Sequence, residues 1–503
     1  MSLLSPSVSL GRRGEDLLDR FGDHPSVWFE GSWHRSAELA GRARRAARGF
    51  VELGVRPGDR VVVVMANCPE VGLTYSALWR AGAVPTPALF LLTEDELRHV
   101  VTDSGAVAVV TTPEFLAKVQ AAAPGLPVVV VGGAGGTSWE ELEAGEELPL
   151  VDRAGDDLAA LLYTGGTTGR SKGVALTHAS MDAAGKAAAD LAYSPGRSSI
   201  LLPLPLAHAY GLLVTVAGLH GREPGRSVLM RWFDPAGWVQ LVDEHRLQTS
   251  ALVPSMIQML LAQPLEEHDL SCLERVSSGA APLAAEVAAE FERRIPSVEI
   301  REGYGCTESS ALISTQLPDE RRLGSVGKPV PGVEVRIELP DGSTAGPDED
   351  GEICVRGATV MQGYWQSPEA TGFALRDGWL HTGDVGHLDA DGWLYVVDRI
   401  KDLIIRGGFN VYPRDVEDVL LAHPEVVAAA VVGKPDPKLG EEVVAFVQLV
   451  PGAAATPEEL IACSKERLGA YKYPREVRVV DAIPLTSVMK TDRKALRSLV
   501  SGG

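Results

Sequence analysis

One stretch of the chain guides the interpretation of the rest: Tyr163-Thr164-Gly165-Gly166-Thr167-Thr168-Gly169-Arg170-Ser171-Lys172-Gly173-Val174. Its glycines allow backbone N–H groups to approach an anion without an intervening Cβ, its threonines add hydroxyl donors, and Lys172 adds a positive charge. In the nucleotide-binding loop Gly-x-x-x-x-Gly-Lys-Ser/Thr, a hydroxyl follows the lysine and holds magnesium, whereas glycine follows it here. The stretch therefore predicts a phosphate-binding loop of a different kind, placed after the apolar run 158–162.

Length and composition are those of a multidomain globular protein: 503 residues, 45% hydrophobic and 23% charged. We expect no membrane span and a cytoplasmic location, because apolar runs are short and the N-terminus does not resemble a secretion signal. The five cysteines are widely separated, which favours free thiols over zinc or disulfides. A net charge of −20 argues against nucleic acid as a partner, and both a monomer and a homodimer remain open.

The hydrophobic pattern predicts an α/β fold with two domains. In the N-terminal third, buried strands are expected at 60–65, 106–111 and 127–131, and helices at 71–81 and 94–104. Residues 324–397 change to short alternating strands separated by Gly, Pro and Asp, which predicts a β-rich subdomain.

After residue 401 a helix is expected at 413–421 and strands at 426–432 and 443–449. We therefore predict a large N-terminal domain, 1–399, with two α/β subdomains and the β-rich subdomain, followed by a small α+β C-terminal domain, 400–503.

Three further segments carry side chains suited to a nucleotide. In Gly303-Tyr304-Gly305-Cys306-Thr307-Glu308-Ser309, the tyrosine ring can stack on a purine, and the Thr and Glu oxygens suit magnesium. In Trp379-Leu380-His381-Thr382-Gly383-Asp384, the carboxylate suits ribose hydroxyls, with Arg399 downstream. Near the C-terminus, Lys490 offers a cation within a segment, 465–497, that has nine basic and four acidic residues. That segment is either an anion-binding surface or a solvated helix face.

In this order the segments resemble the adenylate-forming superfamily, which includes acyl-CoA synthetases, firefly luciferase and adenylation domains of nonribosomal peptide synthetases. The resemblance runs from about Trp33 to Arg497. It implies that a carboxylate attacks the α-phosphate of Mg·ATP, that an acyl-adenylate forms, and that a thiol then displaces AMP. Gly165 after Tyr-Thr is most similar to bacterial fatty acyl-CoA synthetases, which implies a medium- or long-chain fatty acid as substrate and coenzyme A as acceptor.

The resemblance also implies roles for single residues. The implied catalytic residues are Lys490, Glu308, Thr307 and His208, with Glu308 as the Mg²⁺ ligand. ATP phosphates would contact Thr164, Gly165, Gly166, Thr167, Thr168, Gly169 and Lys172. Adenine and ribose would contact Gly279, Ala280, Ala281, Tyr304, Gly305, Asp384 and Arg399. The acyl pocket would include His208, Ala209, Gly211 and Gly303. Lys401 would be the hinge of a mobile C-terminal domain, and the CoA or phosphopantetheine arm would contact Gly407, Gly408 and Lys472.

Several positions leave alternatives open. His208 stands where amino-acid-activating relatives have Asp, so an α-amino acid is not expected. This histidine is a gate, a hydrogen-bond partner of a carboxylate, or a core residue. Arg231 is a candidate partner for a second substrate carboxylate, whereas Glu352 and Tyr364 are expected to be structural.

Leu485 and Met489 replace the Arg and Gly that most relatives have near the lysine. The alternative functions are an enzyme that loads an aryl or β-amino acid onto a carrier-protein phosphopantetheine, and a non-catalytic nucleotide-binding regulatory protein.

Overall fold

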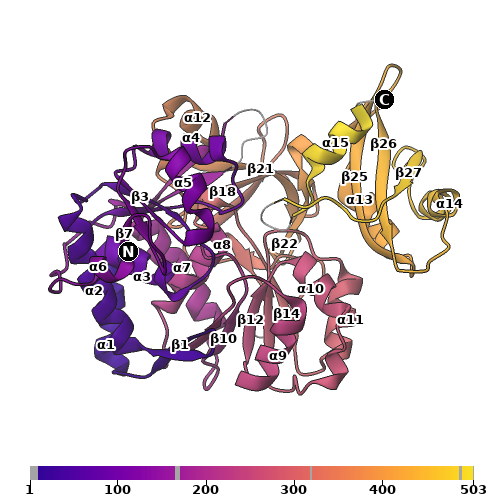
Figure 1. Cartoon of the computed structure of the whole chain (residues 1–503). Helices are drawn as coiled ribbons and strands as arrows, with labels where there is room; N and C mark the ends of the chain where they lie inside the picture. Colours follow the sequence, from indigo (N-terminus) through magenta and orange to yellow (C-terminus); the bar gives the residue numbers. More distant parts are fainter. Residues whose placement is uncertain (1–8, 165–169, 318–319, 487–489, 502–503) are drawn as a thin grey trace.

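The computed structural model describes residues 9–164, 170–317, 320–486 and 490–501. Figure 1 shows a large body that contains the N-terminus and a small domain at one side that contains the C-terminus. In the described residues, no helix is both long and apolar enough to cross a membrane.

The largest sheet forms one half of the N-terminal body, and its central strands β14, β13, β12, β10, β11 and β1 pair in parallel. Helices α9, α10 and α11 cover one face, because Trp238, Ile257 and Phe291 pack in one apolar cluster with inward residues of the strands. In spatial order the strands are β16 (Lys328–Pro329), β15 (Ser314–Thr315), β14 (Glu299–Tyr304), β13 (Arg275–Ser278), β12 (Thr249–Leu252), β10 (Ser199–Leu202), β11 (Arg226–Leu229), β1 (Pro25–Phe29) and β2 (Ser32–Arg35). The three covering helices are α9 (Pro235–His245), α10 (Pro254–Leu261) and α11 (Ala285–Arg294). Two further helices of the N-terminal body are α7 (His178–Ala192) and α8 (Ala209–Gly218).

A second, five-stranded parallel sheet carries the elements predicted for the N-terminal third. Strand β3, inside this sheet, is buried on both faces and is nearly all valine. Val61 and Val63 pack toward one helical layer, and Val62 and Val64 pack toward the other. In spatial order the strands are β4 (Val84–Pro87), β3 (Arg60–Val64), β5 (Ala108–Thr111), β6 (Val128–Val130) and β7 (Thr137–Ser138). The surrounding helices are α1 (Leu10–Phe21), α2 (Ser36–Glu52), α3 (Pro69–Arg80), α4 (Glu94–Ser104), α5 (Leu116–Ala122) and α6 (Trp139–Leu142).

The helix predicted at 71–81 begins two residues earlier, at Pro69, because proline fits the first helical turn, where its missing N–H has no partner to lose. The helix predicted at 94–104 has those bounds. There Thr93 and Glu96 form a reciprocal cap, in which the Thr93 hydroxyl accepts from the Glu96 N–H.

The predicted β-rich subdomain is confirmed, and a short sheet leads into the phosphate-loop segment. The first contains β17 (Val333–Glu338), β18 (Gly351–Gly357), β20 (Leu375–Arg376), β21 (Trp379–Leu388) and β22 (Leu394–Arg399), and α12 (Pro368–Ala374) lies beside it. The second contains β8 (Leu158–Thr164), β9 (Lys172–Thr177) and β19 (Gly363–Tyr364). Strands β8 and β9 pair in antiparallel register, with Thr164 opposite Lys172.

In the C-terminal domain, successive residues of the hairpin formed by residues 426–436 and 440–449 pack against opposite layers. Val431 and Val443 pack with α13 and α14, whereas Val432 and Val444 pack with α15. The strands are β24 (Phe409–Val411), β23 (Ile404–Arg406), β26 (Gly440–Leu449), β25 (Val426–Asp436) and β27 (Glu476–Val479), and the helices are α13 (Pro413–Leu421), α14 (Pro457–Arg467) and α15 (Arg493–Ser501). The hairpin is longer than predicted, because its polar tip continues to pair after the apolar pattern ends.

Candidate functional site

One continuous cavity of about 2410 Å³ connects the large sheet, the β-rich subdomain and the C-terminal domain. Most of the residues predicted for the site line it: Thr164, Lys172, His208, Ala209, Gly279, Ala280, Ala281, Gly303, Tyr304, Gly305, Thr307, Glu308, Asp384, Arg399, Lys401 and Lys490. Gly165, Gly166, Thr167, Thr168 and Gly169 lie outside the described residues. Gly211, Gly407, Gly408 and Lys472 do not line the cavity.

Strand pairing brings the predicted ribose residues together. Asp384 on β21 and Arg399 on β22 are cross-strand partners, and Arg399 Nε lies 2.8 Å from Asp384 Oδ1. The Tyr304 hydroxyl donates to Asp384 Oδ2 over 2.6 Å, while Oδ1 accepts no aligned hydrogen bond from the described residues. Because the Asp384 side chain is only 4% exposed, a buried acceptor with free capacity remains beside an aromatic ring.

Glu308 follows Tyr304 on a single 3₁₀ turn, Thr307–Ser309. The Tyr364 hydroxyl donates to Glu308 Oε1 over 2.8 Å and orients the carboxylate, while its oxygens keep lone pairs for a cation. A fixed carboxylate next to a threonine hydroxyl is a donor set that fits Mg²⁺. Tyr364, expected to be structural, therefore acts directly on a predicted site residue, and its ring also lies 5.2 Å from Lys172 Nζ.

Lys490 belongs to the C-terminal domain but reaches the cavity formed by the N-terminal body. Its backbone is held by Thr486, which donates its N–H to the Lys490 carbonyl over 2.6 Å. Burial and the nearby charges of Arg399 and Lys401 lower the pKa of the Lys490 ammonium to about 8, against the opposing effect of Asp384. Lys490 is therefore still mostly protonated at neutral pH. Leu485, one of the two departures near this lysine, is 39% exposed, and Met489 lies outside the described residues.

His208 is the N-cap of α8, and its Nδ1 accepts the Tyr210 N–H over 3.2 Å. Nδ1 is thus an acceptor, so the neutral ring carries its proton on Nε2. Burial, reinforced by the Lys490 charge, lowers the pKa of His208 to about 3 and keeps the ring neutral. His208 lines the cavity, so it offers a neutral N–H donor there.

The loop before His208 is held by a buried asparagine that follows β3. Asn67 Nδ2 donates to the Leu204 carbonyl over 2.8 Å and to the Met230 carbonyl over 3.0 Å. Its Oδ1 accepts the Leu206 N–H over 2.9 Å. These partners are more than 130 positions away, so the local sequence carries no signal for them.

Two predicted glycines are required by close approach of the backbone. A Cβ on Gly305 would lie 2.3 Å from the Ala311 carbonyl oxygen, and one on Gly211 would lie 2.2 Å from the Pro205 carbonyl oxygen. Gly211 was predicted for the acyl pocket, but it packs α8 on the preceding loop instead. Ala280 adopts a φ of 71°, an unusual value for a residue with a Cβ, in the loop that lines the cavity.

The predicted thiol-arm residues lie on the C-terminal domain away from the cavity. Gly407 and Gly408 have φ values of 60° and 82° and connect β23 to β24, the conformation of a tight hairpin turn that favours glycine at both positions. Lys472 Nζ pairs with Asp415 over 2.6 Å. Lys401 lies in the 3₁₀ turn Ile400–Asp402 between β22 and β23.

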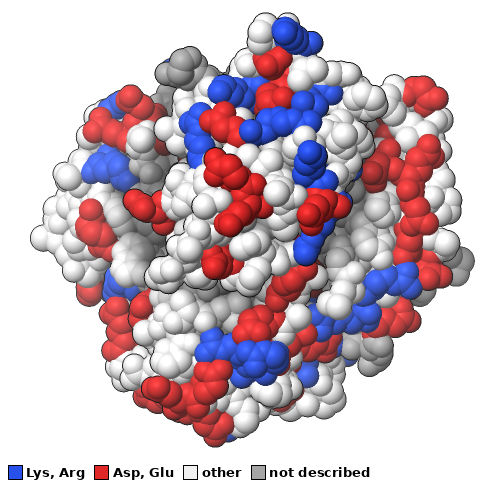
Figure 2. All heavy atoms as spheres, turned by 90° about the vertical axis from the view of Figure 1, so that its right-hand side faces the viewer, with Lys and Arg blue, Asp and Glu red and all other residues white. Residues whose placement is uncertain are grey.

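The basic C-terminal segment does not form one continuous cationic surface on the face shown in Figure 2, where basic and acidic side chains are interspersed. Several of its residues have acidic partners: Arg478 pairs with Glu476, Arg493 with Glu417 and Arg497 with Asp402.

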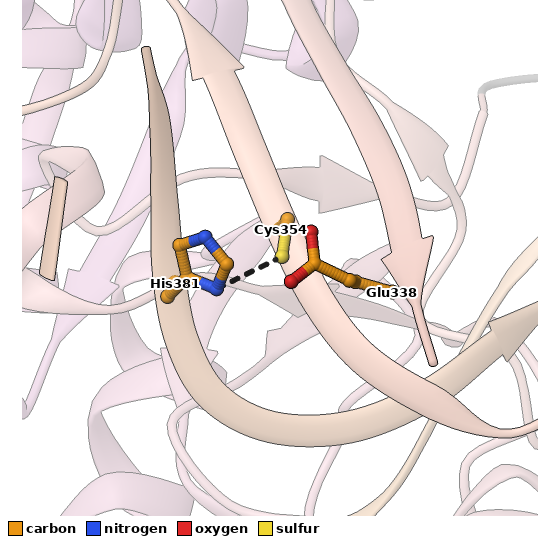
Figure 3. Close-up of side chains that lie close together, drawn as sticks. All are labelled: Glu338, Cys354 and His381. Carbon is orange, nitrogen blue, oxygen red and sulfur yellow. Dashed lines mark hydrogen bonds between the residues drawn. The ribbon is translucent and has the colours of Figure 1, made fainter. Parts of the chain in front are cut away.

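A separate cluster of Glu338, Cys354 and His381 has potential ligand atoms within 4.8 Å of one another (Figure 3). His381 Nδ1, however, also lies 2.6 Å from Arg376 Nη2, and burial raises the pKa of the Cys354 thiol to about 12. The positive charge of Arg376 beside His381 disfavours a cation at this cluster. The cluster joins three strands of the β-rich sheet and does not line the cavity.

A large cavity, a lysine supplied by a second domain and a neutral histidine on the same cavity fit an ATP-using, carboxylate-activating ligase. Comparisons with known proteins agree: the profile described as AMP-binding enzyme matches residues 15–365, and that of the AMP-binding enzyme C-terminal domain matches 415–490. The chain belongs to this adenylate-forming family and is an AMP-forming acid–thiol ligase that joins a carboxylic acid to CoA through an acyl-adenylate. The non-catalytic alternative is thereby set aside.

Individual relatives differ in the acid they are named for. A feruloyl-CoA synthase from Amycolatopsis sp is 39% identical over 457 residues, which cover 90% of this chain and 90% of that protein. A long-chain-fatty-acid–CoA ligase from Bacillus subtilis is 33% identical, covering 98% of this chain and 94% of that protein. The crystal structure of ATP-bound MatB from Rhodopseudomonas palustris has a TM-score of 0.90 at 33% identity, covering 98% of this chain and 99% of that chain.

Proposed function

We propose that this ligase binds its acid with the carboxylate between His208 and Lys490, and with the rest of the acyl group along β13. The observation that carries the proposal is that Lys490, from the C-terminal domain, is buried in the same cavity as Asp384 and Arg399. This arrangement fits the first half-reaction, the attack of the carboxylate on the α-phosphate of ATP.

The nucleotide would lie between the loop 279–281 and Tyr304. Asp384 Oδ1 would accept a ribose hydroxyl, because it is a buried acceptor that has no aligned donor among the described residues. Thr164 and Lys172 flank the segment 165–169, and with it they would contact the β- and γ-phosphates, which leave as pyrophosphate.

Two groups would act on the reacting atoms. The protonated Lys490 would stabilise negative charge on the α-phosphoryl oxygens as the carboxylate attacks. His208 would donate its Nε2–H to the substrate carboxylate and orient one oxygen for attack, without adding a charge that would weaken the nucleophile. Thr307 would contact the α-phosphate. Glu308 would hold Mg²⁺, which supplies positive charge to the phosphates.

The second half-reaction needs the CoA thiol to reach the adenylate. We propose that the C-terminal domain rotates about Lys401 and brings the Gly407–Gly408 turn to the cavity in place of Lys490. Until then, the position of Lys490 shields the adenylate from water. Lys472, now paired with Asp415, would become available to the CoA arm.

The far part of the cavity favours an acid with a polar end. Beyond Tyr210, whose hydroxyl donates to the Ser277 carbonyl over 3.1 Å, the lining includes Arg275, Ser277 and Thr249. Desolvating these groups against a bare alkyl chain would be unfavourable. The medium- or long-chain fatty acid predicted from the sequence is the second candidate, supported by Val214 and other apolar residues that line the cavity.

The test is ATP–pyrophosphate exchange with fatty acids of several lengths and with hydroxycinnamates, followed by AMP release on addition of CoA or of a carrier protein. We expect exchange with at least one acid and AMP release with free CoA. Release only with the carrier protein would favour the carrier-loading alternative. Equal loss of both steps in Lys490→Ala would contradict the two-conformation scheme, which predicts loss of exchange with thioester formation from supplied adenylate retained.

A further inference from the structure

We propose that Arg275 binds a second acidic group at the far end of the acyl substrate, so that the preferred acids are dicarboxylates or acids with a comparable distal anion. The inference rests on the proposed function, because it concerns the acid that occupies the same cavity.

Arg275 is placed to contact the far end of an acyl group. It begins β13, the strand that ends at Ser278, directly before the Gly279 loop. Three residue steps along a strand correspond to about 10 Å, so Arg275 lies about that far from the nucleotide end of the cavity. Val276 packs in the core on the opposite face of the sheet, whereas Arg275 and Ser277 are on the cavity face.

The Arg275 guanidinium is buried without a counter-ion. The residue is 7% exposed, and no carboxylate in the described part of the chain lies within 4.0 Å of it. Nη1 donates to the Ala192 carbonyl at the end of α7 over 2.7 Å, whereas the buried Nε has no hydrogen-bond partner among the described residues. A single backbone carbonyl compensates little of the positive charge of this buried cation.

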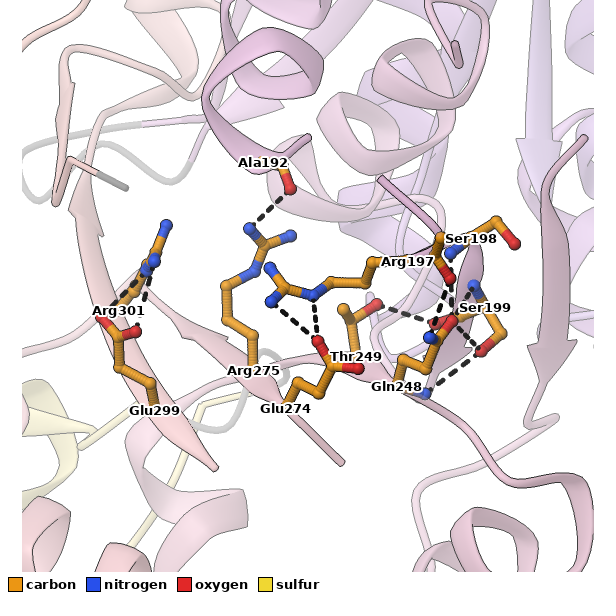
Figure 4. A network of polar contacts seen from close by, with 11 residues as sticks. Ala192, Arg197, Ser198, Ser199, Gln248, Thr249, Glu274, Arg275, Glu299 and Arg301 are labelled. Atoms are coloured by element: carbon orange, nitrogen blue, oxygen red, sulfur yellow. Dashed lines mark hydrogen bonds and ion pairs between the residues drawn. The ribbon is translucent and has the colours of Figure 1, made fainter. Parts of the chain in front are cut away.

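Two further arginines lie beside Arg275, and each has a carboxylate partner. Arg197 and Arg301 lie on either side of Arg275 in Figure 4 and have their own carboxylates, Glu274 at 2.8 Å and Glu299 at 3.0 Å. Among the described residues, neither of these carboxylates pairs with Arg275 itself. Burial, with Arg197 and Arg301, lowers the pKa of Arg275 to about 10, so the group remains charged at neutral pH.

An anion matches this environment better than a neutral polar group. A carboxylate in the cavity can accept from an Nη group and neutralise the charge of the guanidinium. The other arginine considered from the sequence does not serve this purpose: Arg231 pairs with Glu30 at 2.6 Å and does not line the cavity.

The structure also offers a competing role for Arg275, because a cation at the C-terminus of α7 stabilises that helix. The two roles differ in one measurable respect. A helix-capping arginine affects all acids alike, whereas a substrate-binding arginine affects only acids that carry the distal anion.

The experiment is ATP–pyrophosphate exchange with dicarboxylates from succinate to sebacate, each compared with the monocarboxylate of equal length, and with ferulate. In the wild type we expect kcat/KM for the best dicarboxylate to exceed that of its monocarboxylate by roughly tenfold to hundredfold, the effect of one charge-assisted contact. In Arg275→Met this ratio should fall to about one, while monocarboxylate exchange changes little. Arg231→Met is the matched control and should keep the wild-type ratio.

A wild-type ratio at or below one at every length would overturn the inference even if Arg275→Met does not fold. An equal fall of kcat/KM for dicarboxylates and monocarboxylates in Arg275→Met would also overturn it, because that result is expected of an arginine that only caps α7. Preference for ferulate over every dicarboxylate would refute the distal anion but leave the proposed function intact. Absence of exchange with all acids, ferulate and fatty acids included, would refute the proposed function itself.

Discussion

The buried position of Lys490 predicts a specific pH dependence for adenylation. Its pKa of about 8 reflects burial and the charges of Arg399 and Lys401, partly offset by Asp384 and Cys306. About nine-tenths of the enzyme is then protonated at pH 7 and about one-tenth at pH 9. Because the cation is the active form, kcat/KM should fall as pH rises through 8, by about tenfold per pH unit above it. His208, neutral above a pKa of about 3, should not contribute in this range.

The assay is ATP–pyrophosphate exchange without CoA, so that the CoA thiol does not titrate in the measurement. kcat/KM reports the free enzyme, in which this pKa applies. In Lys490→Arg the absolute rate should fall, but the basic limb should disappear, because a guanidinium stays charged throughout the range. A wild-type profile that is flat to pH 9.5, or an unchanged basic limb in Lys490→Arg, would refute the assignment.

Three other substitutions test two contacts around the cavity and the proposed thiol-arm turn. Tyr364→Phe removes the hydroxyl that orients the Glu308 carboxylate, at about 1.5–3 kcal/mol, and should raise the Mg²⁺ concentration for half-maximal exchange roughly tenfold or more; an unchanged Mg²⁺ titration would contradict this role. Asn67→Ala leaves three buried backbone groups without hydrogen-bond partners. The free energy of unfolding, measured by chemical denaturation, should fall by about 2–4 kcal/mol, with a parallel loss of exchange activity. An unchanged unfolding midpoint would show that the loop does not depend on Asn67. Gly408→Ala should slow thioester formation more than exchange. Gly452→Ala is the control, because Gly452 has a similar φ of 83° and a side chain there costs about 1–2 kcal/mol as well. An equal effect of both substitutions on thioester formation would argue against a thiol-arm role for Gly408.

Much of the secondary structure could be predicted from the sequence, because its signals are local. The valine run of β3 and the Thr93–Glu96 cap of α4 each specify an element within a few residues. Predictions were less accurate where pairing extends beyond the apolar pattern. The β25–β26 hairpin continues to Gly440, because backbone hydrogen bonds sustain a ladder whose side chains are polar.

The candidate site could be predicted where its residues lie in compact motifs, and less well where it depends on distant partners. The Tyr304 motif and Asp384 were identified from their own neighbours in the chain. The contact of Tyr364 with Glu308 was not predicted, because the two residues are 56 positions apart in the sequence. Arg275 carried no signal, because an arginine at the start of a strand is ordinary until its surroundings are known.

The sequence by itself therefore determined the chemistry available to this protein: a phosphate-binding loop, a tyrosine and acidic residues for a nucleotide, and a distant lysine. Those properties belong to the residue types and their spacing. Only the tertiary structure decided which charges are buried, which are paired and which remain free, because desolvation and pairing depend on neighbours from other parts of the chain. That is how Lys490 has a pKa near 8, and how Arg275 remains a cation without a counter-ion.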